Sequence, residues 1–194
     1  PTDPLENLKF RLSLWEECMR SERARYLVWQ ACKADIIFFI NVFGWQTNPD
    51  HFEEEDGPFI CFDFQRDAVL LTIAKLFYEH ILVVWEKSRK QGGTLLLLFI
   101  VAWLTIFYTR KRGLVMSHRK EAVEQSDDED TLFGKTDFLI KALPSWMQQG
   151  LPRVKNVYKM RKTNSKIVGT STTVYAAAID KTTGLPIASS SVPI

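Results

Sequence analysis

The residues best suited to chemistry lie together in one short stretch, which consists of Lys87, Ser88, Arg89, Lys90, Gln91, Gly92, Gly93 and Thr94. Basic side chains attract phosphate, glycines let the backbone approach an anion closely, and a threonine hydroxyl is a ligand for Mg²⁺. A turn that leads from a strand into a helix also directs free backbone N–H groups at one point. The composition of this stretch is therefore typical of a phosphate-binding loop.

The stretch departs from the standard phosphate-loop pattern G-x-x-x-x-G-K-[ST]. When it is aligned on Gly92 and Thr94, Lys87 replaces the first glycine and Gly93 replaces the lysine. The two basic residues inside the stretch would then supply positive charge from the other side of the loop. On these residues alone, a tight glycine turn with solvated basic side chains is the better explanation.

The segments around this stretch predict an α/β domain. Residues 81–86 (ILVVWE) form a continuous apolar run typical of a strand buried on both faces, and residues 113–118 (GLVMSH) predict a second strand. Between them, residues 95–108 predict a long helix that is apolar on all sides and therefore buried. Strand, helix and strand in this order imply parallel pairing through a crossover helix. Residues 157–171 predict a hairpin that turns at Asn164-Ser165.

The N-terminal part has a helical pattern. Asp3-Pro4-Leu5-Glu6 is typical of a capping box with proline at the first helical position. The apolar residues that follow fall on one helical face: Leu5, Leu8, Leu12 and Trp15. A second helical pattern starts near Ser21, and further helices are predicted from Gln65 onward and over residues 131–147.

Composition is ordinary for a globular protein, with 46% apolar and 25% charged residues in 194. A net charge of +2 is too small to predict a nucleic-acid partner, but the charges are unevenly distributed. Residues 121–130 carry acids and no base, whereas residues 151–179 carry bases and no acid. Two solvated loops of opposite sign explain this simply. The bases are Arg153, Lys155, Lys159, Arg161, Lys162 and Lys166.

Cysteine usage predicts neither a zinc site nor a disulfide framework. Cys18, Cys32 and Cys61 are odd in number and far apart, which fits a reducing compartment. The N-terminal residues lack the layout of a secretion signal. The acidic loop around His51 has no known metal-ligand spacing, so we expect a solvated loop there.

A membrane anchor at residues 95–108 is an alternative interpretation of the long apolar run. Fourteen residues fall short of the ~20 needed to span a bilayer's hydrocarbon core. Basic residues flank both ends and give no orientation. We therefore favour a buried helix and expect no membrane partner.

Five motifs in order resemble the ATPase region of the large terminase subunit of tailed bacteriophages. That family carries a phosphate loop of the form K-S-R-Q-x-G-x-[ST], and this sequence departs from it at Lys90. Residues 57–69 (GPFICFDFQRDAV) are similar to the family's adenine-recognition motif, and residues 39–50 to the aromatic segment before it. Residues 115–147 and 164–173 resemble the following strand, acidic turn, helix and hairpin. The loop positions that match are Lys87, Ser88, Arg89, Gly92 and Thr94.

The resemblance implies an α/β fold with a three-layer P-loop NTPase core and a parallel sheet, preceded by N-terminal helices and incomplete. Residues 1–57 would be the N-terminal helical segment, residues 58–173 the partial ATPase core and residues 174–194 a divergent tail. It further implies that Arg89 is catalytic, that Gln65 with Phe64 binds adenine and that Thr94 binds Mg²⁺. ATP phosphates would contact Ser88, Arg89, Lys90, Gln91, Gly92, Gly93 and Thr94.

The resemblance also implies a function and partners. The chain would be the ATP-binding motor region of a DNA-packaging terminase, which uses ATP and Mg²⁺ to translocate double-stranded DNA into a procapsid in the host cell cytoplasm. Partners would be the portal protein and the small terminase subunit, with a homo-oligomer on the portal. The alternative is a non-catalytic DNA-binding or assembly fragment that retains the fold; a membrane-associated protein is less favoured.

The sequence departs from the family at the residues that activate water. The family places an Asp-Glu pair after four apolar residues, and phosphoryl transfer needs both a positioned water and charge neutralisation. Here Asp180 follows an apolar run, but Lys181 replaces the glutamate and no acid comes later. Asp180 is thus a weak candidate Mg²⁺ ligand, and no nuclease domain is found. We expect a truncated, split or frame-shifted terminase in which hydrolysis by this chain alone is doubtful.

Overall fold

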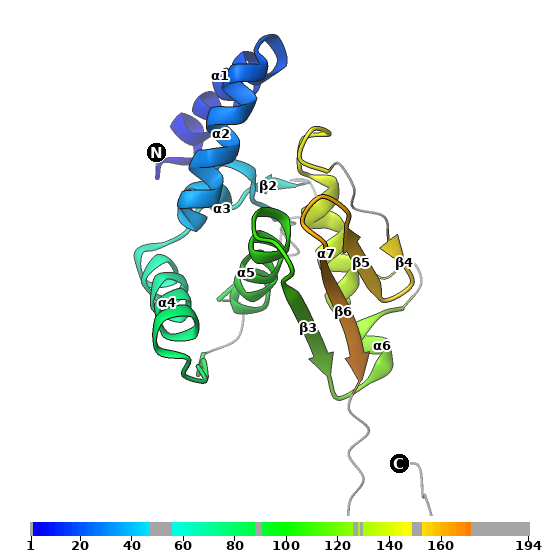
Figure 1. The fold of residues 1–194 in the computed structure, drawn as a ribbon. Coiled ribbons are helices and arrows are strands. Elements are labelled where there is room, and N and C mark those ends of the chain that lie inside the picture. Colours follow the sequence, from blue (N-terminus) through cyan, green and yellow to red (C-terminus); the bar gives the residue numbers. More distant parts are fainter. Residues whose placement is uncertain are drawn as a thin grey trace, which may run out of the picture.

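The computed structural model describes residues 2–46, 56–87, 91–125, 128, 130–148 and 153–171. Figure 1 shows a group of N-terminal helices at one end, the helix α5 at the centre and a four-stranded sheet on the other side. This arrangement is an α/β fold, as the sequence predicts.

Three helices begin the chain: α1 (Pro4–Arg20), α2 (Glu22–Ala34) and α3 (Ile36–Phe43). The side chain of Asp3 accepts a hydrogen bond from the Glu6 N–H at 2.9 Å, which confirms the predicted start of α1. Ser21 ends α1 and caps α2. Asp35 ends α2 and accepts hydrogen bonds from two N–H groups of α3. One cap residue at each junction therefore splits the N-terminal helical pattern into three helices.

A short ribbon and two helices follow. The strands β1 (Trp45–Gln46) and β2 (Gly57–Pro58) pair antiparallel. The helix α4 (Asp63–Ala74) continues into the π-helical turn η1 (Lys75–Glu79), and α5 (Gly93–Phe107) is the predicted apolar helix. Of the helices within the described ranges, none combines the length and apolar character required to cross a bilayer.

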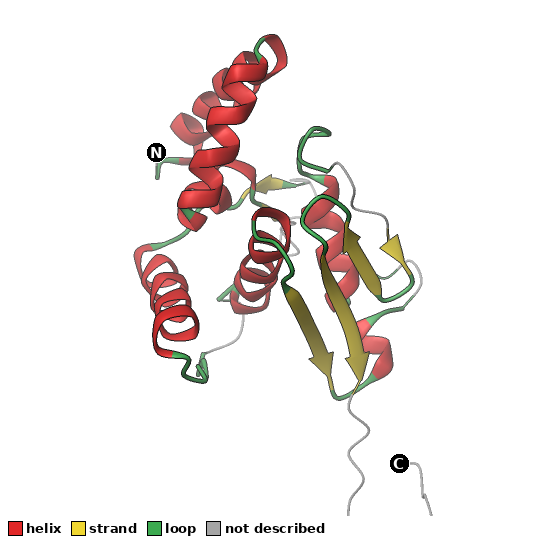
Figure 2. Ribbon diagram, viewed as in Figure 1, coloured by secondary structure: helices red, strands yellow, loops and turns green. Residues whose placement is uncertain are grey.

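The predicted buried strand at residues 81–86 is wrong. Residues 80–87 form a loop with no ladder to any described strand (Figure 2). Leu82 and Val84 are 84% and 82% exposed, and the partly buried Trp85 donates from Nε1 to the Thr72 hydroxyl of α4 at 2.8 Å. A strand buried on both faces needs neighbouring strands to satisfy its backbone N–H and C=O groups. Lacking such neighbours, this segment lies against α4 instead.

The sheet contains β3 (Arg112–Ser117), β4 (Arg153–Val154), β5 (Val157–Met160) and β6 (Ser165–Ser171), in the order β3-β6-β5-β4. The strands β3 and β6 pair parallel, whereas β5 pairs antiparallel with β6 and with β4, so the described sheet is mixed. The predicted strand near residue 113 and the hairpin of β5 and β6 are confirmed. The parallel pair is joined through α6 (Lys120–Val123), α7 (Leu132–Lys141) and β4–β5, and not through α5.

Helices cover one face of this sheet. A Cβ built on Gly169 of β6 would lie 2.9 Å from a methyl of Val123 in α6 and 3.0 Å from Phe133 Cδ2 in α7. Gly113 of β3 faces Val101 of α5 on the same side. On the opposite face, Leu114 and Met116 are 59% and 51% exposed. The described residues therefore form two layers, one of helices and one of sheet, whereas the resemblance implies three layers.

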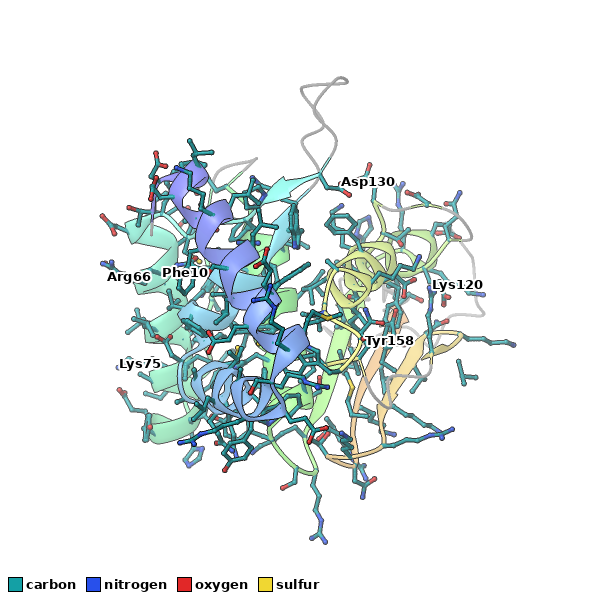
Figure 3. All side chains as sticks on the ribbon, turned by 90° about the horizontal axis from the view of Figure 1, so that it is seen from above. Phe10, Arg66, Lys75, Lys120, Asp130 and Tyr158 are labelled. Atoms are coloured by element: carbon teal, nitrogen blue, oxygen red, sulfur yellow. The ribbon has the colours of Figure 1, made fainter. Side chains whose placement is uncertain are left out.

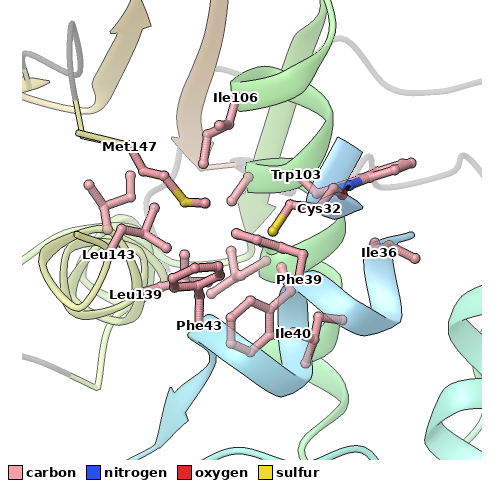
Figure 4. Packing of buried hydrophobic residues seen from close by; sticks show 14 of the residues in the cluster. Cys32, Ile36, Phe39, Ile40, Phe43, Trp103, Ile106, Leu139, Leu143 and Met147 are labelled. Atoms are coloured by element: carbon pink, nitrogen blue, oxygen red, sulfur yellow. Dashed lines mark hydrogen bonds between the residues drawn. The ribbon is translucent and has the colours of Figure 1, made fainter. Parts of the chain in front are cut away.

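The core centres on α5, which packs against α3, α4, α7 and the sheet. The ring centroid of Phe39 in α3 lies 6.3 Å from that of Phe99 and 5.4 Å from that of Phe107, both in α5. Trp103 donates from Nε1 to the carbonyl of Cys32 at 2.7 Å. Figure 4 shows Phe39, Trp103 and Cys32 in one cluster with Leu139 of α7. Residues of the N-terminal helical segment (1–57) and residues of the segment that follows it (58–173) thus share one core.

A buried arginine joins α1 to this core. Arg11 is 1% exposed and donates to Asn7 Oδ1 at 2.6 Å, to the carbonyl of Gly44 at 2.7 Å and to the carbonyl of Phe59 at 3.0 Å. Its guanidinium also lies over the Trp45 ring at 5.4 Å. Burial lowers the pKa of Arg11 to about 10, so the group stays charged at neutral pH. Arg11 therefore ties α1 to the segments that lead into β1 and α4.

Candidate phosphate and nucleotide site

The glycine pair of the predicted phosphate loop begins α5. Gly92 is the N-cap residue with φ 68°, a left-handed conformation that favours glycine. Gly93 is buried in the first turn and Thr94 is exposed beside it. No described side chain caps this end of α5. The first-turn N–H groups therefore need water or an anion as acceptor, as a phosphate loop requires.

The amide of Gln65 connects the start of α4 to this loop. Gln65 Oε1 accepts the Phe62 N–H at 3.0 Å, and its Nε2 donates to the carbonyl of Gln91 at 3.0 Å. A Cβ on Gly92 would lie 3.3 Å from this Nε2 and 3.5 Å from the Phe59 ring, so the close approach depends on glycine. The fold thus brings together the predicted adenine motif and the predicted phosphate loop.

The two residues predicted to bind adenine point in different directions. Gln65 is 4% exposed and faces the loop, whereas Phe64 is 56% exposed. The Phe64 ring stacks on that of Phe62, with centroids 5.9 Å apart and planes 7° apart. The amide of Gln65 already uses one N–H and one lone pair, which leaves one of each for a ligand. An adenine edge would reach them only after Gln65 becomes more exposed.

The side chain of Lys87 lies over the first turn of α5. A Cβ on Gly93 would be 2.6 Å from Lys87 Cε, so the lysine stem occupies the space beside this glycine. The resemblance identified Lys87 as a motif position, but only the fold shows that its side chain returns to the helix start. Ser88, Arg89 and Lys90 lie outside the described residues, and so does the predicted catalytic role of Arg89.

The predicted Mg²⁺ ligands are only partly described. Thr94 is exposed in the first turn of α5, and Asp180 lies outside the described residues. Within the described ranges, no group of three or more His, Cys, Asp or Glu side chains could hold a metal ion. An ion at Thr94 would therefore take its other ligands from phosphate oxygens and water, as Mg²⁺ commonly does.

Two basic segments form one surface on the sheet. Arg112 of β3 pairs in register with Lys166 of β6, which pairs with Lys159 of β5. These three side chains belong to the sheet face that the helices leave open. Arg110 donates its N–H to the carbonyl of Thr163 at 2.8 Å, which holds the two segments together. We call residues 110–112 and 159–166 the basic surface; neither segment contains an acid.

Arg153 is not part of the basic surface. Its guanidinium forms ion pairs with Glu124 and with Asp137 of α7, and it lies 5.5 Å from the Phe133 ring centroid. The contribution of Arg153 is therefore structural, and the cations that face outward are those of β3, β5, β6 and the turn after β5.

An aromatic hollow elsewhere contains none of the predicted site residues. It has a volume of about 420 Å³ and is lined by Trp15, Trp45, Phe138, Asp56, Lys141 and Ala142. We place the candidate site at the start of α5 because uncapped backbone N–H groups and two glycines meet there, whereas the residues that line the hollow include no glycine.

Comparisons with known proteins supply no relative for this site. A scan against protein-family models found no match to the chain, and a search of curated proteins found no related sequence.

Proposed function

We propose that this chain is the ATP-binding motor region of a phage DNA-packaging terminase. One observation supports this most: the hydrogen bond from Gln65 to the carbonyl of Gln91, beside the left-handed Gly92 that begins α5. The two residues belong to separate motifs of the terminase pattern, and direct contact between them is what a shared nucleotide site requires.

In this proposal each loop residue has a defined task. The N–H groups of Gly92 and Gly93 donate hydrogen bonds to the phosphate oxygens, and Arg89 neutralises the charge on the β- and γ-phosphates. Thr94 contributes its hydroxyl to Mg²⁺. Gln65 binds the adenine edge with its remaining N–H and lone pair. The proposal covers ATP binding; hydrolysis by this chain alone is outside it, because Lys181 stands where the pattern has a glutamate.

Equilibrium binding of a fluorescent ATP analogue with Mg²⁺ tests the nucleotide site. Arg89→Ala should weaken binding by roughly 10- to 100-fold, because a charge-assisted hydrogen bond to phosphate is lost. Arg23→Ala, at an exposed arginine in α2, is the matched control and should bind normally. The nucleotide site would be refuted if both variants weakened binding equally. It would also be refuted if the unmodified chain, shown by circular dichroism to be folded, did not bind the analogue.

Two further variants separate the roles of the loop residues. Thr94→Val keeps the shape and removes the hydroxyl, so it should reduce the dependence of binding on Mg²⁺. Thr109→Val, after the other end of α5, is its control. Gln65→Glu keeps the acceptor for Phe62 and loses the donor to Gln91, and should weaken ATP binding more than GTP binding. Equal losses for the two nucleotides would remove adenine recognition from the proposal.

The second candidate is a DNA-binding fragment without hydrolysis, which the basic surface favours. Like charges directly opposite on neighbouring strands repel each other, so Arg112, Lys166 and Lys159 are disfavoured unless an anion compensates them. A duplex backbone is such an anion, and the three positions span two strand spacings of about 4.8 Å each. Exposed neighbours on this face are aliphatic, whereas binders of single strands present aromatic rings.

Fluorescence anisotropy with a short DNA duplex at several salt concentrations tests the basic surface. Lys159→Gln combined with Lys166→Gln should weaken binding and reduce the slope of log affinity against log salt by about 2. Lys120→Gln combined with Lys141→Gln is a control with the same charge change at exposed lysines elsewhere. Equal effects of the two pairs would mean that DNA responds to net charge and not to this surface.

The proposed partners follow from the same function. A terminase motor region in the host cytoplasm would meet the portal protein and the small terminase subunit, and would assemble as a homo-oligomer on the portal. Binding measured with purified portal is the direct check on that part of the proposal.

A further inference from the structure

The helix α1 buries polar side chains on the face that meets the core and exposes apolar side chains beside that face. The face turned to the core buries Asn7, Arg11 and Cys18, two of which are polar. The apolar positions lie beside this face and are largely open to solvent: Leu5 is 61% exposed, and Leu12 and Met19 are 54% and 80% exposed. Large apolar side chains gathered on one helix surface generally mark an interaction site.

The spacing of these side chains is that of a helix–helix seam. Gaps of three and four residues alternate along the set that we call the apolar stripe: Leu5, Leu8, Leu12, Trp15 and Met19. This alternation of a and d positions keeps one line of side chains facing a partner helix. Leu5, Leu12 and Met19 are too exposed to be covered by a described helix, whereas Leu8 and Trp15 are half-buried and the Trp15 ring stacks on Phe43 of α3 with ring centroids 6.4 Å apart. Figures 1 and 3 place α1 and α2 together at one end of the molecule, where a second molecule can approach.

The charges beside the apolar stripe identify the partner. Lys9 and Glu16 flank it on the solvent side and are 63% and 70% exposed, whereas Arg11 and Cys18 flank it on the buried side. In a two-fold antiparallel pair the solvent-side flanks of both helices face each other. Lys9 of each copy then approaches Glu16 of the other, so the dimer contains two such pairs of opposite charge. A parallel pair would set Lys9 and Glu16 against the buried flank, where they have no accessible counterpart.

We propose that α1 packs antiparallel against α1 of a second copy of this chain through the apolar stripe. Leu12 of one copy then lies across from Trp15 of the other, and Leu8 across from Met19. The seam is short, so the dimer depends on a few central side chains, of which Leu12 and Trp15 lie nearest the two-fold axis. This interface is separate from the nucleotide site and from the basic surface, so its test is independent of the proposed function.

Sedimentation velocity over a range of concentrations tests the pairing. The unmodified chain should form a concentration-dependent dimer. Leu12→Lys should raise the dissociation constant by about 100-fold or more, because both copies lose a central apolar contact and gain a charge. Leu71→Lys on α4, at a leucine 56% exposed, is the matched control and should leave the dimer unchanged. Because both leucines are exposed, circular dichroism should show that both variants fold.

Exchanging the charges of Lys9 and Glu16 tests whether the two α1 helices pack antiparallel. Lys9→Glu and Glu16→Lys should each weaken the dimer several-fold, because each sets like charges against each other twice. The double variant restores opposite charges and should restore the affinity. A chain that is monomeric at all concentrations, a dimer that tolerates Leu12→Lys, or a double variant no better than the single ones would each overturn the antiparallel pairing. Capture of a different protein through Leu12 by a monomeric chain would likewise overturn it.

Discussion

Replacement of Arg11 by methionine tests how α1 is held to the rest of the molecule. Methionine is unbranched and can replace the aliphatic stem of arginine, but it lacks the guanidinium and donates no hydrogen bonds. The change removes the hydrogen bonds from Arg11 to Asn7 Oδ1 and to the carbonyls of Gly44 and Phe59, of which the Gly44 carbonyl keeps the Phe59 N–H at 2.9 Å. It also removes the cation from the face of Trp45.

Two opposing contributions determine the expected magnitude. Hydrogen bonds from a charged donor contribute about 1.5–3 kcal/mol each, so three of them contribute roughly 4–9 kcal/mol. Against this, burial lowers the pKa of Arg11 to about 10, which corresponds to a cost of about 3 kcal/mol for the charged form. The hydrogen bonds outweigh the burial of the charge, and we expect Arg11→Met to lower the free energy of unfolding by about 1–6 kcal/mol.

Urea denaturation followed by circular dichroism measures this change. Arg20→Met is the control, because Arg20 lies on the same helix with a side chain 81% exposed and a solvent-exposed ion pair to Glu16. Such pairs contribute little, so the control should shift the free energy of unfolding by less than about 0.5 kcal/mol. If Arg11→Met were as mild as the control, or stabilising, the buried guanidinium would not be holding α1 in place.

Three further predictions concern single groups in the fold. Gly92→Ala should destabilise the chain by about 1–2 kcal/mol in urea denaturation, because a Cβ is strained at φ 68° and crowds Gln65 Nε2. The Cys61 thiol should react slowly with an aromatic disulfide reagent at pH 8 in the folded chain and rapidly in denaturant, because burial raises its pKa to about 11; fast reaction in the folded state would contradict the structure. Burial raises the pKa of Asp137 above its ordinary value; Lys141 opposes this rise and the Glu124 carboxylate adds to it. The contribution of this carboxyl to stability therefore declines as pH rises between its unfolded and folded pKa values. Glu124→Gln should lower the pKa of Asp137 in an NMR titration, and an unchanged or higher value would count against that charge interaction.

The candidate site was predictable in its parts and not in its arrangement. The glycine pair, Thr94 and Gln65 were identified from residue types and order along the chain. The sequence could not show that Gln65 would donate to the carbonyl of Gln91, because that bond joins residues 26 positions apart. It also predicted Phe64 beside Gln65 at the site, but neighbouring residues on a helix point about 100° apart. Phe64 therefore faces solvent when Gln65 faces the loop.

Local chemistry by itself determined where several elements begin and end. Asp3 and Ser21 mark helix starts because a side-chain oxygen accepts a backbone N–H three residues later, an interaction that needs no other part of the fold. The hairpin of β5 and β6 and the apolar helix α5 likewise follow from patterns within one segment. These predictions are confirmed because the groups that satisfy them lie within a few residues of each other.

Tertiary structure decided the features that need a distant partner. Residues 81–86 have the composition of a buried strand, yet a strand exists only where another strand offers its backbone groups, and none is described beside them. The apolar face of α1 is a similar case, since the sequence specifies which side chains share a face but not which face meets the core. Arg11 determines that choice, because its three buried hydrogen bonds are available only when the polar side of α1 turns inward.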